Sequence, residues 1–430
     1  MIKKIIGAVA MLAIISIGVY SGVGIYHHLK QNQKTAQRVS KVEATKKDDE
    51  KKAEKSIITQ AEFLGKQYNY EAALKLLQDK DAAKDKKAKA LSEQLKKEEE
   101  QLIVWPDNGK ISHLFFHSLI ADPARAFDGD SKDQGYRDYM VTVDEFKKIL
   151  DQLYKNQFVL VAMKDIVADQ NGKMTYQEIK LPEGKKPLVI SQDDVNYYEY
   201  MDGDGFAKNL TIKDGKVVNT YIDAAGKIQY GAYDMAPIID EFVNEHPDFS
   251  YRGAKGILAL TGYNGTLGYR SSVSEYGDNE KTKAEGEKAK KVAEALRNDG
   301  WEFASHSWGH LNFTKTPLPN LEEDTSKWKN EVAPLIGDSD ILIYPFGADI
   351  SDIKPYDGNP KYDYLKGQGF KVYCNVDASV PAWAQLEDGY LRQARINVDG
   401  IRFKSELDGK NTVLNEFFDT KSVIDPIRTK

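Results

Sequence analysis

From residue 105 onward, short apolar runs rich in β-branched residues alternate with amphipathic helical patterns, and this alternation limits the possible folds more than any other feature of the chain. Strands in such a rhythm pair in parallel and need helices to cover the sheet. The runs predict strands at 113–120, 157–162, 187–191, 256–261, 301–305, 341–344 and 370–374, and helices at 142–154, 237–244 and 284–298. The pattern predicts an α/β domain with a parallel sheet, either a barrel or a doubly wound sheet.

This domain is expected to cover residues 105–425, with an insertion. Between 203 and 231 the rhythm breaks, and the turn-forming pairs Asp214-Gly215 and Ala225-Gly226 separate short stretches of Thr, Val, Ile and Tyr. Such pairs favour tight turns between antiparallel strands. We therefore expect one or two inserted β-hairpins there.

The chain begins with a segment that favours a membrane. Lys3 and Lys4 precede an uncharged stretch from Ile5 to Tyr26, which is long enough to cross the hydrocarbon core of a bilayer. We interpret residues 1–30 as a signal-anchor, with a cleaved signal peptide as the alternative. The expected location is the cell membrane, single-pass, with the α/β domain extracellular, or else secretion.

Two segments separate this anchor from the α/β domain. Residues 31–55 are rich in Lys, Asp and Glu, which predicts a solvated linker. Residues 56–103 show helical spacing of apolar residues, typical of a short helical segment that resembles one tetratricopeptide-type hairpin. We expect it to act as a spacer, with docking of a protein partner as the alternative.

Charge and cysteine content exclude some classes of function. The net charge of −6 argues against a general nucleic-acid binder, so no nucleic-acid partner is expected. Cys374 is the single cysteine, which excludes a disulfide scaffold and a zinc site built from several thiolates.

Two clusters of polar residues follow predicted strands. Asp193 and Asp194 come directly after one strand, and His306 and His310 come directly after another. α/β folds assemble their sites at the carboxyl ends of parallel strands. Neighbouring residues point in different directions, so one carboxylate can ligate a metal while the other faces the substrate. Taken alone, the carboxylates also fit a turn or helix cap and the histidines an ordinary loop.

Together the two clusters favour a metal site. Histidines at positions i and i+4 converge on one face if the segment turns helically. Asp194, His306 and His310 would then hold a divalent ion, with open positions for water and substrate. Two imidazoles and one carboxylate suit zinc, which we favour, and also iron, cobalt or nickel.

Three motifs now stand in order along the chain: the Asp193-Asp194 pair, His306-Ser307-x-x-His310, and the turn Pro345-Phe346-Gly347. In this combination the chain resembles the polysaccharide deacetylases, the NodB-homology group of carbohydrate esterase family 4, from about residue 112 to 403. The resemblance implies a distorted (β/α) barrel. It also implies hydrolytic removal of acetyl groups from N-acetylglucosamine-type residues of a cell-wall or extracellular polysaccharide.

The resemblance also implies roles for single residues. Asp194, His306 and His310 would hold the metal, and Asp193 would be the general base. The backbone N–H of Phe346 would donate to the oxyanion of the transition state.

The chain departs from the family pattern in three places. Ser191, Gln192 and Val195 replace residues around the carboxylate pair, and Ile343 stands where an arginine often precedes the Pro-aromatic-Gly turn. The late Leu-x-His motif, which usually supplies the general acid, is absent.

We expect His117 to be the acid instead. It lies near the carboxyl end of the first predicted strand, and it resembles the early histidine of the exopolysaccharide branch of the family. A hydrogen-bonded histidine at a strand end is the structural alternative.

Two other functions stay open at this point. One is a non-catalytic, surface-anchored glycan-binding protein with the same fold. The other is a scaffold that uses the helical hairpin to bind partners. Metal content separates the scaffold from the first two functions, and acetate release separates the enzyme from the glycan-binding protein.

Overall fold

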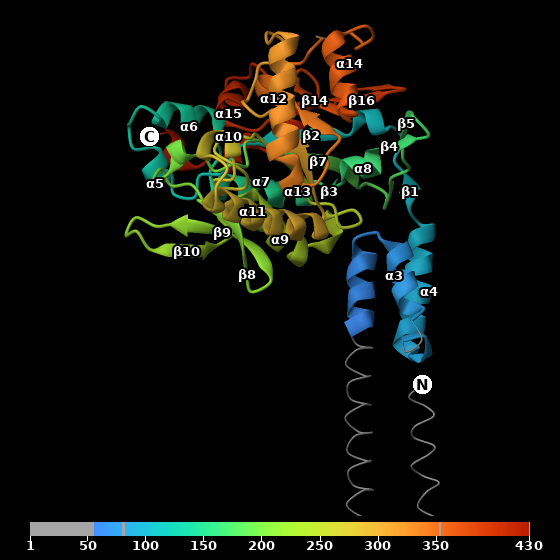
Figure 1. Cartoon of the computed structure of the whole chain (residues 1–430). Coiled ribbons are helices and arrows are strands. Elements are labelled where there is room, and N and C mark those ends of the chain that lie inside the picture. Colours follow the sequence, from blue (N-terminus) through green and yellow to red (C-terminus); the bar gives the residue numbers. More distant parts are fainter. Residues whose placement is uncertain (1–55, 80–81, 352–353, 430) are drawn as a thin grey trace, which may run out of the picture. The chain divides into compact units, whose positions relative to one another are not determined.

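The computed structural model describes residues 56–79, 82–351 and 354–429 (Figure 1). The expected anchor at 1–30 and linker at 31–55 lie outside these residues. None of the described helices combines the length and apolar character needed to span a bilayer. The described residues divide into two compact units, one with 56–61, 74–79 and 82–92, and the other with 62–73, 93–351 and 354–429.

The segment before the α/β domain is helical. Residues 56–66 form one helix, and α3 (Tyr70–Leu77) and α4 (Lys86–Glu100) follow. These helices fall in the part of the sequence where helical spacing occurs. The roles of spacer and docking module stay predictions.

In the described part of the chain, seven parallel strands close into a barrel in the order β11-β12-β13-β14-β16-β2-β7, with β7 pairing back onto β11. The bounds are β2 Ser112–Phe116, β7 Lys186–Gln192, β11 Gly256–Leu260, β12 Trp301–Ser305, β13 Ile341–Ile343, β14 Val372–Val376 and β16 Tyr390–Asn397. The (β/α) barrel is therefore the arrangement that the chain adopts, and a doubly wound sheet is excluded.

The barrel is irregular beside β7. The first half of β7 pairs with β3 (Phe158–Leu160), whereas Ser191 and Gln192 near its end pair with β11. A further strand, β15 (Ala384–Glu387), runs antiparallel to β16. The carboxyl end of β7 thus closes the barrel against Ile257 and Leu258 in the first half of β11.

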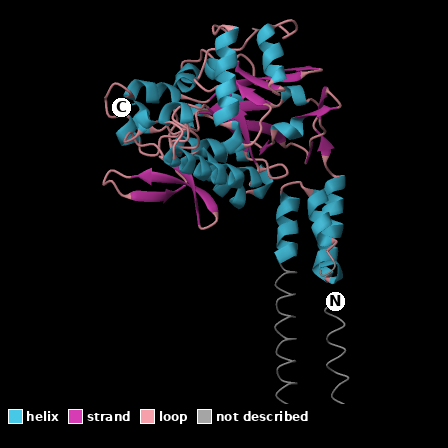
Figure 2. Ribbon diagram, viewed as in Figure 1, coloured by secondary structure: helices cyan, strands magenta, loops and turns pink. Residues whose placement is uncertain are grey.

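Helices lie around the strands (Figure 2). The longer ones are α7 Val143–Lys155, α9 Met235–Glu245, α11 Glu280–Asn298, α12 Leu318–Glu331, α14 Pro360–Gly367 and α15 Gly400–Leu407. The shorter ones are α5 Pro123–Ala126, α6 Asp133–Tyr139, α8 Met163–Ile166, α10 Val273–Tyr276, α13 Ala333–Ile336 and α16 Thr420–Val423.

Helix α7 shows how the local sequence sets an element. A capping box opens the helix, since the Thr142 side chain accepts from the backbone N–H of Glu145 and the Glu145 carboxylate accepts from that of Thr142. The apolar side of the helix is buried, and the ring of Phe146 meets that of Phe116 on β2 edge to face. Apolar contacts of this kind join the helices and the barrel into one continuous core.

The remaining strands lie outside the barrel. β8 (Asn209–Lys213), β9 (Lys216–Ile222) and β10 (Ile228–Gly231) form an antiparallel sheet within the segment where hairpins were expected. It lies at the lower left of Figure 1. β4 (Val167–Gln170) pairs with β5 (Lys173–Tyr176), and β1 (Ile103–Val104) pairs with β6 (Lys180–Leu181).

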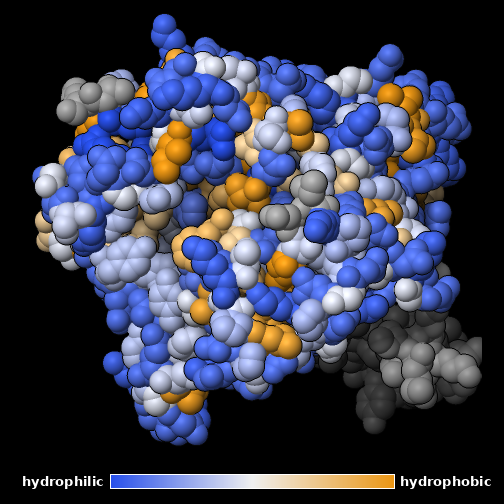
Figure 3. All heavy atoms as spheres, turned by 90° about the horizontal axis from the view of Figure 1, so that it is seen from above, coloured by the Kyte–Doolittle hydropathy of each residue, from blue (hydrophilic) through white to orange (hydrophobic). Residues whose placement is uncertain are grey.

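One end of the barrel gathers the polar residues of interest. His117 follows β2, Asp193 and Asp194 follow β7, and His306 follows β12. Because all seven strands are parallel, their carboxyl ends meet at this same end. The face shown in Figure 3 is mostly hydrophilic, with hydrophobic residues in small separate groups.

Candidate active site

A cavity of about 450 Å³ lies at the carboxyl ends of the barrel strands. Its size is in the range of small-molecule sites. The structure brings together in its lining every site residue that the sequence predicts, namely Asp193, Asp194, His306, His310, His117 and Phe346.

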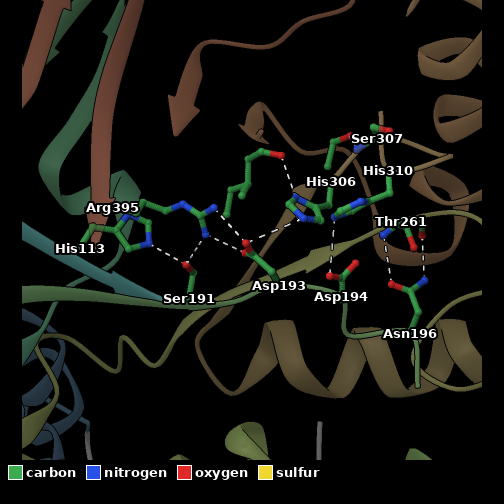
Figure 4. A network of polar contacts seen from close by, with 12 residues as sticks. His113, Ser191, Asp193, Asp194, Asn196, Thr261, His306, Ser307, His310 and Arg395 are labelled. Atoms are coloured by element: carbon green, nitrogen blue, oxygen red, sulfur yellow. Dashed lines mark hydrogen bonds and ion pairs between the residues drawn. The ribbon is translucent and has the colours of Figure 1, made fainter. Parts of the chain in front are cut away.

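Asp194, His306 and His310 form a possible metal site. One ligand atom from each of them lies within 4.8 Å of the others. His310 Nε2 is 3.8 Å from Asp194 Oδ2 (Figure 4). Burial lowers the pKa of His310, although Asp194 opposes that shift, so the imidazole favours its neutral form, which has a lone pair to offer.

Neighbouring groups orient two of these side chains. His306 Nδ1 lies 2.9 Å from the carbonyl oxygen of Ile343, so the proton sits on Nδ1 and the Nε2 lone pair is left for a ligand. The hydroxyl of Tyr198 donates to Asp194 Oδ1 at 2.6 Å, which leaves Oδ2 for the site. This donor set, already oriented by its neighbours, fits a divalent transition-metal ion.

The two histidines converge although the segment between them is not helical. Residues 306–310 form a loop in which Ser307 and His310 have positive φ, at 61° and 54°. Asp324 of α12 fixes the bend because its carboxylate accepts from the backbone N–H groups of Trp308 at 2.8 Å and Gly309 at 2.6 Å. The two imidazole centroids are 5.0 Å apart.

Asp193 has a different partner from its neighbour. Arg395 of β16 binds it with two hydrogen bonds, from Nη1 to Oδ1 at 2.7 Å and from Nη2 to Oδ2 at 2.9 Å. Both side chains are buried. Burial by itself would raise the pKa of Asp193, but Arg395 outweighs it and holds the pKa well below its ordinary value. Asp193 is therefore an ionised carboxylate at the edge of the triad, with Oδ2 3.8 Å from His306 Nε2.

Arg395 is fixed by a second set of contacts inside the barrel (Figure 4). Its Nη1 donates to Ser191 Oγ at 3.2 Å, and Ser191 Oγ lies 2.8 Å from His113 Nε2. His113 Nδ1 lies 2.9 Å from Gln393 Oε1, so Nδ1 carries the proton and Ser191 donates to Nε2. Burial lowers the pKa of His113 to about 3, which keeps this imidazole neutral.

His117 is the described histidine that lines the cavity besides the two candidate ligands. It is half-buried, and its ring makes no hydrogen bond within the described residues. Asp399, the N-cap of α15, lines the same cavity. Burial raises the pKa of Asp399, and the nearby His117 opposes that shift.

Phe346 lies in a strained turn. It follows Pro345 in the short 3₁₀ segment Pro345–Gly347, with φ at 59° and ψ at 9°. Positive φ is uncommon for a bulky residue. At Gly347 a Cβ atom would lie 2.5 Å from that of Val376, so the turn needs glycine. Within the described residues the Phe346 N–H makes no backbone hydrogen bond, and its ring packs on His310 at 4.4 Å between centroids.

Four further residues lie around the site and stood in no prediction from the sequence: Arg395, Tyr198, Asp324 and Asp399. Arg395 lies 202 positions from Asp193 in the sequence, whereas Tyr198 lies four positions from Asp194. Ile343 lies buried on β13, and the guanidinium beside Asp193 belongs to Arg395. Gln192, another departure, donates to both oxygens of Asp234 at 2.8 and 2.9 Å.

No family model matches the chain, and no curated protein matches its sequence. Among solved structures, the chain is similar to the deacetylase PplD of Streptococcus pyogenes, solved in complex with acetate. The two are 12% identical, with a TM-score of 0.39, over 67% of this chain and 92% of that one.

Proposed function

We propose that this chain is a metal-dependent hydrolase of the polysaccharide deacetylase type, which removes acetyl groups from N-acetylglucosamine-type residues of a cell-wall or extracellular polysaccharide. The observation that carries the proposal is that two adjacent carboxylates have different partners. Asp194 faces His310 and completes the triad, whereas Asp193 is held by Arg395 beside it.

Asp194, His306 and His310 would hold the ion, zinc being favoured. When bound, a divalent ion lowers the pKa of water and polarises the acetamide carbonyl. Asp193 accepts the proton of the attacking water, because it is the carboxylate beside the triad that is not a ligand. Arg395 keeps Asp193 ionised and fixes the direction of its oxygens.

Two further groups act on the oxyanion and on the leaving amine. The backbone N–H of Phe346 donates a hydrogen bond to the developing oxyanion, and the φ of Pro345 together with the left-handed turn fixes its direction. His117 donates a proton to the amine nitrogen as the C–N bond breaks. An amine needs that proton, since an amide anion is a very poor leaving group.

The choice of a sugar substrate rests on the rim of the cavity. Phe346 is 70% exposed and Tyr139 is 52% exposed, and both line the cavity. Aromatic faces beside polar groups suit pyranose rings, which are apolar on one face and polar at the edge. With the expected anchor, such a substrate would lie outside the cytoplasmic membrane.

Acetate release tests the proposal. The full-length protein is stripped of metal, reloaded with zinc, cobalt or nickel, and assayed on N-acetylated chito-oligomers, poly-N-acetylglucosamine and peptidoglycan. We expect metal-dependent acetate from at least one of them and none from a His306→Ala control. Glycan binding without acetate from any substrate would contradict the proposal and establish the non-catalytic alternative.

A further inference from the structure

The hydroxyl of Tyr198 contacts the candidate metal site through Asp194. Tyr198 is 3% exposed, and its oxygen lies 2.6 Å from Asp194 Oδ1 and 2.7 Å from Thr261 Oγ1. A carboxylate that ligates a metal is ionised and can only accept, so Tyr198 donates to Asp194 and accepts from Thr261. The shorter distance is typical of a hydrogen bond strengthened by the charge of the acceptor.

Thr261 follows β11 directly and is itself held in place (Figure 4). Its backbone N–H donates to Asn196 Oδ1 at 3.1 Å, and Asn196 Nδ2 donates to the Thr261 carbonyl oxygen at 2.9 Å. Both residues are fully buried. The hydroxyl of Tyr198 therefore links Asp194 to a fixed point at the end of β11.

Aromatic stacking fixes the ring that carries this hydroxyl. The Tyr198 ring stacks on Tyr263, with centroids 4.6 Å apart and 6° between the planes, and on Tyr200, at 5.6 Å and 15°. The backbone N–H of Tyr263 donates to the carbonyl oxygen of Trp308, in the loop between the two histidines, at 3.2 Å. The hydroxyl therefore cannot leave Asp194 unless these rings separate.

The backbone between Asp194 and Tyr198 is strained. Asp194 and Tyr197 have positive φ, at 59° and 50°. This conformation is uncommon for residues other than glycine and costs on the order of 1–3 kcal/mol at each position. It lets a side chain four positions on reach back to Asp194 without a helical turn. Such strain persists only where the surrounding contacts enforce it, and it is concentrated at functional sites.

The hydrogen bond gives the two oxygens of Asp194 different partners. Oδ1 accepts from Tyr198, so Oδ2, which lies 3.8 Å from His310 Nε2, is the oxygen directed toward the histidines. The terminal torsion of a carboxylate is broad when nothing holds it. A donor that holds it before the ion binds removes this freedom in advance. Loss of such a partner typically weakens metal binding by about tenfold to a hundredfold.

We propose that Tyr198 is a positioning residue for the metal: its hydroxyl holds the Asp194 carboxylate with one oxygen toward the two histidines and thereby sets the metal affinity of the site. Tyr198 lies outside the residues that line the cavity, so it acts through Asp194 and not on the substrate. This inference rests on the metal site of the proposed function, but not on the reaction or on the glycan.

The zinc affinity of the full-length protein tests this role. Tyr198→Phe deletes the hydroxyl and keeps the ring, and the dissociation constant for zinc, measured by competition with a chromogenic chelator, is expected to rise by about tenfold to a hundredfold. Tyr200→Phe is the matched control, because its ring belongs to the same stack and its hydroxyl makes no hydrogen bond within the described residues. The absorption spectrum of the cobalt-loaded protein, which reports ligand geometry, should change in Tyr198→Phe and not in Tyr200→Phe.

Two results would overturn the role of Tyr198. One is a Tyr198→Phe protein with the zinc affinity of the parent, and the other is an equal loss in Tyr200→Phe, which would assign the effect to packing of the rings. A parent protein that binds no zinc would overturn this role together with the proposed function. If the parent binds zinc but releases no acetate from any glycan, the proposed function alone fails, and the ratio of the two zinc affinities still decides the role of Tyr198.

Discussion

Arg395 and Asp193 lie 202 positions apart in the sequence and form a bidentate ion pair inside the barrel. Asp194, the next residue, turns away to Tyr198 and His310. Two neighbouring carboxylates with identical chemistry therefore have different surroundings.

The two histidines of the triad should be needed for metal. His306→Ala or His310→Ala removes a ligand, so we expect loss of most bound metal and of all acetate release, with the circular dichroism spectrum kept. Metal is measured by elemental analysis of the purified protein. His246→Gln, whose ring packs against Tyr154 outside the cavity, is the control and keeps its metal. Stoichiometric metal in the His306→Ala protein would contradict the site.

Substitution of each of the two adjacent carboxylates should have a different effect on metal affinity. Asp193→Asn keeps the metal but cuts kcat by at least about two orders of magnitude, the typical effect of losing a general base. Asp194→Asn weakens metal binding as well. Competition with a chromogenic chelator measures both affinities, and equal values for the two variants would show that the assigned roles are wrong.

The buried ion pair between Arg395 and Asp193 predicts that Asp193→Asn also lowers the stability of the fold. Asp193→Asn leaves the guanidinium of Arg395 fully buried without its counter-ion, which is expected to lower the free energy of unfolding by about 3 kcal/mol. Denaturant unfolding of metal-free proteins measures it. Glu323→Gln breaks an exposed pair with Lys327 and should scarcely change the midpoint. Similar midpoints for the two variants would mean that the buried pair contributes no more than a surface pair.

His117→Ala tests the general acid. The side chain makes no hydrogen bond within the described residues, so we expect metal content and fold to survive while most turnover is lost. The alkaline limb of the pH–rate profile should change, because that limb reports loss of the proton to be donated. A variant as active as the parent would place the acid elsewhere.

His113 predicts how stability depends on pH. Its pKa is about 3 in the folded protein, against about 6.5 in an unfolded chain. Between these values the unfolded chain binds a proton that the folded protein does not, so stability falls as the pH drops below about 6.5. The contribution at pH 5 is about 2 kcal/mol. His113→Asn should therefore lose less stability than the parent between pH 7.5 and pH 5, whereas equal losses would contradict the buried neutral imidazole.

Much of the fold could be predicted because its signals are local. Apolar runs located β2, β3, β7, β11, β12, β13 and β14, and the helix expected from residue 142 begins at Val143. The barrel strand β16 was not predicted, because Arg392, Gln393 and Arg395 interrupt its apolar residues, and some strand ends were misplaced. The first strand ends at Phe116 rather than Ile120, because the chain turns at His117 into the cavity wall.

The site was only partly predictable, for physical reasons. Asp193, Asp194, His306 and His310 are marked by type and spacing, but the non-helical loop between the histidines depends on Asp324, which comes from the next helix. Likewise, Arg395 reaches Asp193 through barrel closure, and no pattern near either residue indicates that contact.

Two neighbouring pairs of barrel strands near the site are joined by few backbone contacts, and this affects how firmly the barrel is held together there. The parallel pairing of β7 with β11 comprises two residue pairs, and that of β12 with β13 comprises one. Side chains reinforce both, since Asn196 exchanges two hydrogen bonds with the backbone of Thr261 and His306 binds the carbonyl of Ile343. An ion bound by Asp194 and the two histidines would link the end of β7 to the end of β12, with β11 between them. Removal of the ion should therefore first loosen the strand pairing at this end of the barrel. Amide hydrogen exchange at the ends of β7 and β11 would then become faster.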